Sequence, residues 1–72
     1  MPTHPTALAV HLRNIVLQRT NRGIWNLAVE VLPERVVLRG ETTTFYSKQL
    51  AQESIRKMLP TVMVQNAIEV AA

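Results

Sequence analysis

The side chains that could carry out catalysis or bind a metal ion are few in this 72-residue chain and lie far apart. Cysteine is absent, and the two histidines, His4 and His11, stand seven positions apart with no acidic residue between them. A zinc site takes three or four ligands from a compact group of His, Cys or acidic side chains. The sequence therefore predicts neither a metal site nor a cofactor, and the lack of cysteine excludes disulfides.

The acidic and nucleophilic residues do not form a catalytic pattern either. The glutamates occur singly along the chain, as Glu30, Glu34, Glu41, Glu53 and Glu69. Ser47 and Ser54 lack the glycine-flanked turn that presents a nucleophilic serine. With glycine only at Gly23 and Gly40, the chain has neither a phosphate-binding loop nor a dinucleotide fingerprint. We predict that the protein is not an enzyme and that it acts by binding.

The charge and the apolar pattern of the chain limit the kinds of partner that it is expected to bind. Eight Lys and Arg against five acidic residues give a net charge of +3, which favours anionic partners without specifying one. The first residues, "MPTHPTALAVHLRN", lack the basic region of a signal peptide, and no apolar run is long enough to span a bilayer. We expect a soluble protein, cytoplasmic by sequence, or periplasmic or membrane-peripheral if the chain belongs to a longer exported protein.

The first element expected to position binding residues is a helix over residues 6–19. Thr3 or Thr6 is the expected N-cap, and the segment "RTNRG" is expected to stop the helix at Gly23. Four apolar residues recur at helical spacing and predict a buried stripe, namely Leu8, Leu12, Ile15 and Val16.

Two strands follow, over residues 24–32 and 36–40, joined by a turn at Pro33 and Glu34. Alternation predicts that the core-facing residues of the first strand are Trp25, Leu27, Val29 and Val31. The predicted antiparallel register pairs Val31 with Val36, Val29 with Leu38, and Leu27 with Gly40. Because Pro33 does not suit the tightest hairpin turn, we expect a four-residue connection. Gly40 then marks the point where the chain bends toward the next helix.

A second helix is expected over residues 45–59, capped by Thr43 or Thr44 and stopped by Pro60. Its buried stripe is Leu50, Ala51, Ile55, Met58 and Leu59. A third strand over residues 61–70 completes the order helix, strand, strand, helix, strand. This order predicts an α+β two-layer sandwich in which a three-stranded sheet packs on two helices. The strand order is left open, and the chain is expected to form one domain over residues 1–72.

The segment "VVLRGETTTFYSKQLAQESIRKMLPTVMVQNAIEV" resembles the second half of a BON domain, a small bacterial module named from osmotically inducible and nodulation proteins. The matching features are Val36, Leu38 and Gly40 at a strand end, a short polar link, and a helix carrying Ala51 and Ile55. "LPTVMVQNAIEV" is similar to a family stretch of proline, glycine, valines and asparagine, with Thr61 in place of the glycine. The resemblance covers about residues 8–71. It implies the same element order and binding without catalysis, to phospholipid membranes or hydrophobic ligands.

Helix 6–19 and its basic flank form the first candidate contact surface. Val10 and Leu17 are expected on the side of the helix turned from the sheet, beside Arg13. We predict contact with an anionic phospholipid surface or a hydrophobic ligand through Val10, Arg13, Leu17, Arg22 and Trp25. Arg19, Arg56 and Lys57 are further basic residues that could converge on this surface. Trp25 and Tyr46 are expected to pack on the end of the sheet or, alternatively, to act as interfacial anchors.

The alternative function is protein–protein interaction or homo-oligomerisation through the open sheet face or a sheet edge. The open face is expected to carry four apolar residues, Ala28, Val37, Met63 and Ala67. We do not expect nucleic-acid binding, because the outer strand faces lack aromatic platforms on which bases could stack. The ligand and the oligomeric state are left open by the sequence.

Overall fold

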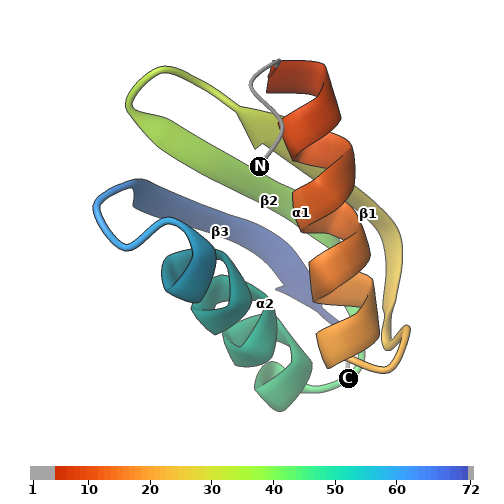
Figure 1. Ribbon diagram of the computed structural model, residues 1–72. Coiled ribbons are helices and arrows are strands. Elements are labelled where there is room, and N and C mark those ends of the chain that lie inside the picture. The colour runs from red at the N-terminus through yellow and green to blue at the C-terminus, as the bar shows by residue number, and fades with distance from the viewer. Residues whose placement is uncertain (1–4, 72) are drawn as a thin grey trace.

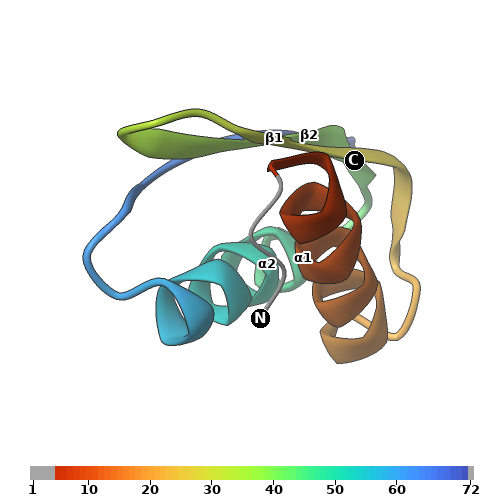
Figure 2. The same ribbon diagram turned by 45° about the horizontal axis from the view of Figure 1, so that its top comes forward.

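The chain folds into two layers, a three-stranded sheet and a pair of helices. The computed structural model describes residues 5–71. Its elements are α1 (Pro5–Arg19), β1 (Ile24–Val31), β2 (Arg35–Thr42), α2 (Phe45–Met58) and β3 (Met63–Val70). Figure 1 and Figure 2 show both helices on the same face of the sheet. The α+β order predicted from the sequence is confirmed.

The strand order, which the sequence left open, is β1-β2-β3. β1 and β2 form an antiparallel hairpin, and β2 and β3 run parallel because α2 carries the chain back between them. Val36, Val37 and Leu38 of the middle strand are all buried. A continuous apolar run of this kind is typical of a strand with neighbours on both sides.

The hydrophobic core lies between the sheet and the helices. Leu12 and Val16 of α1 and Ile55 of α2 are fully buried and pack with Leu38 and Ile68 of the sheet. Each such side chain stabilises the fold by about 1.5–3 kcal/mol relative to an exposed position. The predicted helical stripes are therefore confirmed at their centres, whereas Leu8, Ile15, Leu50, Met58 and Leu59 are half-buried at the margins.

The hairpin register is confirmed near the turn and interrupted further along. Val31 pairs with Val36 and Val29 with Leu38, so four residues connect the closing pair as predicted. A β-bulge then interrupts β1 between Trp25 and Ala28. Its first residue, Asn26, has a φ of 53°, the left-handed conformation that glycine usually adopts at this kind of bulge. Two residues of β1 thus stand opposite one residue of β2.

The bulge overturns the prediction that Trp25 faces the core. Beyond it, Ile24 pairs with Thr42 and is buried, while Trp25 pairs with Glu41 and is 54% exposed. The extra residue reverses the alternation of side chains, because facing in a strand has a period of two. "IW" offers two adjacent apolar residues, and the smaller one takes the core position.

Gly40 lies opposite the bulge, and both its backbone conformation and the space around it explain the glycine, since residues with a side chain rarely adopt its φ of 158°. A Cβ built on Gly40 would lie 3.0 Å from the backbone oxygen of Trp25 and 2.9 Å from Cγ2 of Ile24. The separation from Ile24 is shorter than real Cβ atoms show, and the separation from the backbone oxygen is tighter than most, so the neighbouring atoms would have to move. The bulged strand therefore approaches β2 so closely here that a side chain is excluded.

The end of α1 differs from the prediction in its stop residue. The Arg22 N–H donates to the Leu17 carbonyl at 2.7 Å and the Asn21 N–H to the Gln18 carbonyl at 3.2 Å, the two bonds of a Schellman cap. Asn21 has a φ of 54° and takes the position at which Gly23 was expected. At the other end, the helix begins at Pro5, so Thr6 lies within the helix rather than capping it, and Thr3 lies outside the described residues.

Helix α2 begins and ends as predicted and is tied to β3 by one asparagine. Thr44 is the N-cap, and its Oγ1 accepts a hydrogen bond from the Ser47 N–H at 3.1 Å. The Asn66 amide donates to the Lys48 carbonyl at 2.9 Å and to Gln52 Oε1 at 3.3 Å. Asn66 Oδ1 also accepts from the Ile68 N–H at 3.2 Å. This half-buried amide fixes the position of α2 along β3.

Candidate binding surface

The structure separates the five residues that the sequence proposed as a contact surface. Val10 is 55% exposed, as predicted. Leu17, expected to be exposed, is half-buried and packs against the core. The reason is that α1 contacts both β1 and α2. The buried face of α1 is therefore wider than it would be if the helix packed on the sheet alone. The exposed apolar pair expected on α1 is therefore reduced to Val10 alone.

Arg13 lies on α1 beside the bulge and is engaged within the protein. Its Nε donates a hydrogen bond of 3.0 Å to the carbonyl oxygen of Leu27. Arg22 is exposed in the loop after α1, with a φ of 58°. Leu17 and Arg22 line the same open depression at the end of α1, together with Asn14, Gln18 and Asn21. Of the five predicted residues, these two are brought together.

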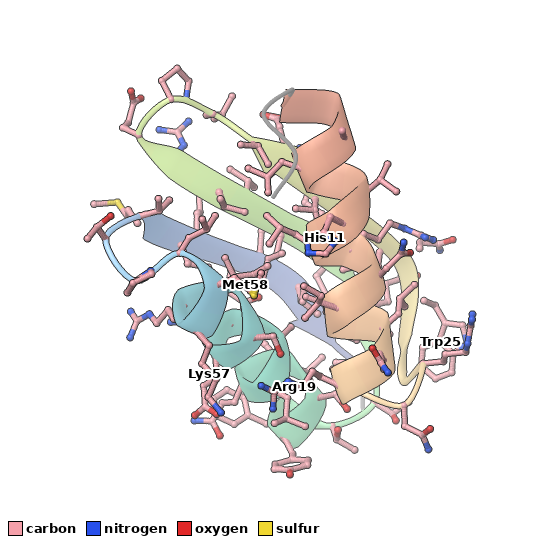
Figure 3. All side chains as sticks on the ribbon, in the orientation of Figure 1. His11, Arg19, Trp25, Lys57 and Met58 are labelled. Carbon is pink, nitrogen blue, oxygen red and sulfur yellow. The ribbon has the colours of Figure 1, made fainter. Side chains whose placement is uncertain are left out.

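The described aromatic side chains gather at a single end of the molecule. Trp25, Phe45 and Tyr46 are the only aromatic residues of the chain, and they are 54%, 62% and 67% exposed. Figure 1 shows α1 ending, β1 beginning and α2 beginning at this end, and Figure 3 shows the Trp25 ring projecting beyond β1. A Cβ on Gly23 would lie 3.3 Å from Ser47 Oγ, which places the loop after α1 directly against the start of α2.

Basic residues surround these rings. Arg19 and Arg22 are exposed at the end of α1, and Lys48 is half-exposed in the first turns of α2. Figure 3 shows Arg19 and Trp25 at the same end of the molecule. Lys48 and Phe45 line one open depression with Val70 and Ala71 at the end of β3, and the carboxylates Glu41 and Glu69 line it too. We call the six residues Trp25, Phe45, Tyr46, Arg19, Arg22 and Lys48 the aromatic end.

Two further basic residues named from the sequence do not join this surface. Arg56 and Lys57 lie in the last turn of α2, and Phe45 begins the helix. A helix of this length separates its two ends by about 20 Å. Arg56 and Lys57 therefore lie apart from the basic residues at the end of α1.

The acidic residues near the aromatic end lie on the open face of the sheet. Glu41 and Glu69 are register partners on neighbouring strands, and Glu41 Oε2 accepts a hydrogen bond from Asn26 Nδ2 at 3.2 Å. Both carboxylates are on the side of the sheet opposite the helices, because their neighbours Gly40 and Ile68 face the core. Trp25 pairs with Glu41 and so shares this face at the edge of β1, whereas Arg19 and Lys48 belong to the helices.

The open sheet face itself is less apolar than the sequence suggested. Val37 is only 2% exposed, although it lies on the face away from the helices. It occupies the centre of the middle strand, between Glu30 and Gln65 across the sheet. Arg39 Nη1 lies 3.8 Å from Glu30 Oε2, so this ion pair covers part of the face. Ala28, Met63 and Ala67 remain exposed, separated by charged residues.

The aromatic end also contains residues that the sequence argument did not weigh. Phe45 and Lys48 were not among the candidates, and Tyr46 was expected either to pack on the end of the sheet or to act as an interfacial anchor. The signal was present in "TTTFYSK", since two aromatic residues in succession at a helix start point about 100° apart and cannot both face one core. Both project from the first turn, before α2 reaches the core through Ala51 and Ile55.

Over residues 5–71, no group of three or more His, Asp or Glu side chains is placed to hold a metal ion. Within the same range, no helix is both long and apolar enough to cross a membrane. The depressions described above are open to solvent and lined by polar and apolar groups in mixture. No family model, curated protein or solved structure matches this chain.

Proposed function

We propose that the protein is a non-catalytic, BON-like binding module whose aromatic end contacts anionic phospholipid surfaces. The observation that carries this proposal is the exposure of Trp25, Phe45 and Tyr46 at one end, beside Arg19, Arg22 and Lys48. A monomeric fold gains nothing from leaving its three aromatic rings more than half in water. Trp and Tyr are favoured at membrane interfaces, where the ring lies among lipid and the polar edge among headgroups.

The charges of the aromatic end suit the same partner. Each Lys or Arg near an anionic bilayer contributes about 1 kcal/mol, so three together favour anionic over neutral membranes on the order of a hundredfold at low salt. Glu41 and Glu69 line the depression of Phe45 and Lys48, so they reduce this preference on the side of the aromatic end next to β3. The element order agrees with that implied by the BON resemblance, which supports the proposal without identifying the lipid.

The contact proposed here differs from the surface first expected along α1. Arg13 donates to the Leu27 carbonyl, and Leu17 packs on the core. Both side chains are therefore engaged within the protein and are left out of the proposed membrane contact. Val10 lies more than two helical turns before Arg19 and belongs to the opposite half of α1. Of the initial set, Arg22 and Trp25 remain in the proposed surface.

Flotation with vesicles of pure phosphatidylcholine and with vesicles containing phosphatidylglycerol tests the proposal. We expect the chain to float with the anionic vesicles and to be released by high salt, because the Debye length shortens. Trp25, the sole tryptophan, should shift its fluorescence to the blue on binding. No association with either vesicle would refute the membrane contact.

Matched variants then locate the surface. Arg19→Gln and Arg56→Gln each remove one exposed arginine from the last turn of a helix. We expect Arg19→Gln to weaken binding about fivefold and Arg56→Gln to leave it nearly unchanged. Likewise, Tyr46→Ala should weaken binding, whereas Met63→Ala, a 70% exposed apolar residue at the far end of β3, should not. Equal losses within each pair would show that binding depends on total charge or apolarity and not on the aromatic end.

A further inference from the structure

The two edges of the sheet are built differently. The β1 edge is interrupted by the bulge at Asn26, and its Leu27 carbonyl already accepts a hydrogen bond from Arg13. Bulges and inward-reaching charged side chains are devices that keep an edge strand from pairing with another chain. A second strand could not continue a regular ladder across the middle of β1.

The β3 edge is regular along its whole length. All eight of its residues, Met63–Val70, pair with β2 without a register shift. The Ala71 N–H donates to the Thr42 carbonyl at 2.8 Å, so the backbone groups of odd-numbered residues point toward β2. Alternation then directs the N–H and C=O groups of Val64, Asn66, Ile68 and Val70 to the free edge. The Ile68 N–H on this edge already donates to Asn66 Oδ1 of its own strand at 3.2 Å, so it must exchange that bond to pair with a new strand.

The composition of β3 does not block this edge. Its single charged residue is Glu69, near one end, and it contains no proline, glycine or lysine. Asn66 is held from the inner side by the Lys48 carbonyl and Gln52, which ties β3 to α2. A long edge strand with regular pairing and a single charged residue near one end is a template for a further strand.

We propose that the β3 edge pairs antiparallel with β3 of a second copy of this chain, so that two sheets join into one of six strands. A two-fold axis near Ala67 or Asn66 brings Glu69 opposite Gln65 or Met63 of the second copy, so the two glutamates stay apart. Opposed like charges, which destabilise strand pairs, are therefore avoided by the symmetry itself.

Helix α2 supplies charge complementarity for the same arrangement. Gln49, Gln52, Glu53 and Arg56 line an open depression on its flank, and Gln52 reaches β3 through Asn66. The two-fold axis that pairs the strands sets the two α2 helices antiparallel beneath the joined sheet. This flank carries both signs of charge, so each helix can offer Glu53 to a basic residue of the other. A second copy fits this combination of edge and flank better than a peptide of one charge.

Two alanines give a matched test. Ala28 and Ala67 are both exposed on the open sheet face and both flank Arg39 in the register, one on each edge strand. Ala67→Glu places a carboxylate at the proposed axis, and Ala28→Glu places the same charge beside β1. Sedimentation velocity of the native chain and both variants, across roughly 1 µM to 1 mM, covers the range in which weak dimers dissociate. Circular dichroism checks that each variant is folded.

We expect a concentration-dependent dimer of the native chain, a dissociation constant raised about tenfold or more by Ala67→Glu, and no change in Ala28→Glu. A native chain that stays monomeric throughout overturns the proposal. If both variants weaken the dimer equally, the proposal is also overturned, and packing through the open sheet face is favoured instead. If neither variant weakens the dimer, the β3 edge is not the contact and the proposal is again overturned. Amide hydrogen exchange is an independent test. The Val64 and Asn66 amides should exchange more slowly as the protein concentration is raised and the dimer forms.

Discussion

Arg13 and Leu27 are joined by a hydrogen bond from Nε to the carbonyl oxygen, 3.0 Å long, that connects α1 to the bulged part of β1. The bulge turns the Leu27 side chain into the core while its carbonyl points to the open edge of the sheet. Without Arg13 this carbonyl would face a new strand or solvent. One side chain thus stabilises the bulge and closes the edge.

The first prediction is that Arg13→Ala lowers the free energy of unfolding by about 1–2 kcal/mol, since a charge-assisted hydrogen bond is lost. Urea denaturation measures this change. Arg22→Asn, which keeps a residue tolerant of positive φ, is the control and should cost less than about 0.5 kcal/mol. The effect on lipid binding should be the reverse, because Arg22→Asn should weaken binding to anionic vesicles more than Arg13→Ala does. An Arg13→Ala variant of native stability would remove the structural role assigned to this residue.

The second prediction concerns Gly40. Gly40→Ala should destabilise the fold by about 2–3 kcal/mol, because its Cβ would press on the Trp25 carbonyl oxygen and on Ile24. Arg39→Ala, the exposed neighbour in β2, serves as the control and should change stability by less than about 1 kcal/mol. Thermal unfolding followed by circular dichroism compares the two. If alanine is accepted at Gly40 without loss, the close approach of the strands at the bulge is wrong.

The bulge marks the limit of what the sequence determines. The alternation of Val29 and Val31 against Val36 and Leu38 predicted the register correctly, because one face of each strand must be buried. "IWNL" contains apolar residues at adjacent positions, so a single extra residue is compatible with either facing of Trp25. Only the packing of Ile24 over Gly40 decides between them, and that contact is not visible in a linear pattern.

The candidate surface was less predictable than the fold for a related reason. Helical spacing identified the buried side of α1 through Leu12 and Val16. It could not show that Leu17 packs against the core, because α1 also contacts α2, and helix–helix contact depends on how two elements pack and not on either one alone. Trp25 and Phe45 lie at the same end because the hairpin sets the start of β1 beside the end of β2, where α2 follows, and this much the predicted register already implied.

The third prediction is that Asn66→Ala is among the most destabilising polar substitutions. Its amide donates to the Lys48 carbonyl and Gln52, and its oxygen accepts from the Ile68 N–H, so three partners lose their bond at once. We expect a loss of about 2–3 kcal/mol in the free energy of unfolding. Asn66→Asp keeps the acceptor but replaces the donor with a carboxylate facing the Lys48 carbonyl, and should not restore stability. Gln65→Ala, the exposed neighbour, is the control.

The fourth prediction joins the two proposals. Antiparallel pairing through β3 would set the aromatic ends of two copies at opposite ends of the six-stranded sheet, because the two-fold axis reverses the strand direction. Such a dimer cannot place both ends on one flat bilayer, but it can connect two vesicles. Dynamic light scattering should therefore show anionic vesicles clustering on addition of the native chain. Ala67→Glu should bind vesicles without clustering them, whereas Tyr46→Ala should dimerise and bind weakly. Vesicle binding by the native dimer with no growth in particle size would contradict this arrangement of the two surfaces.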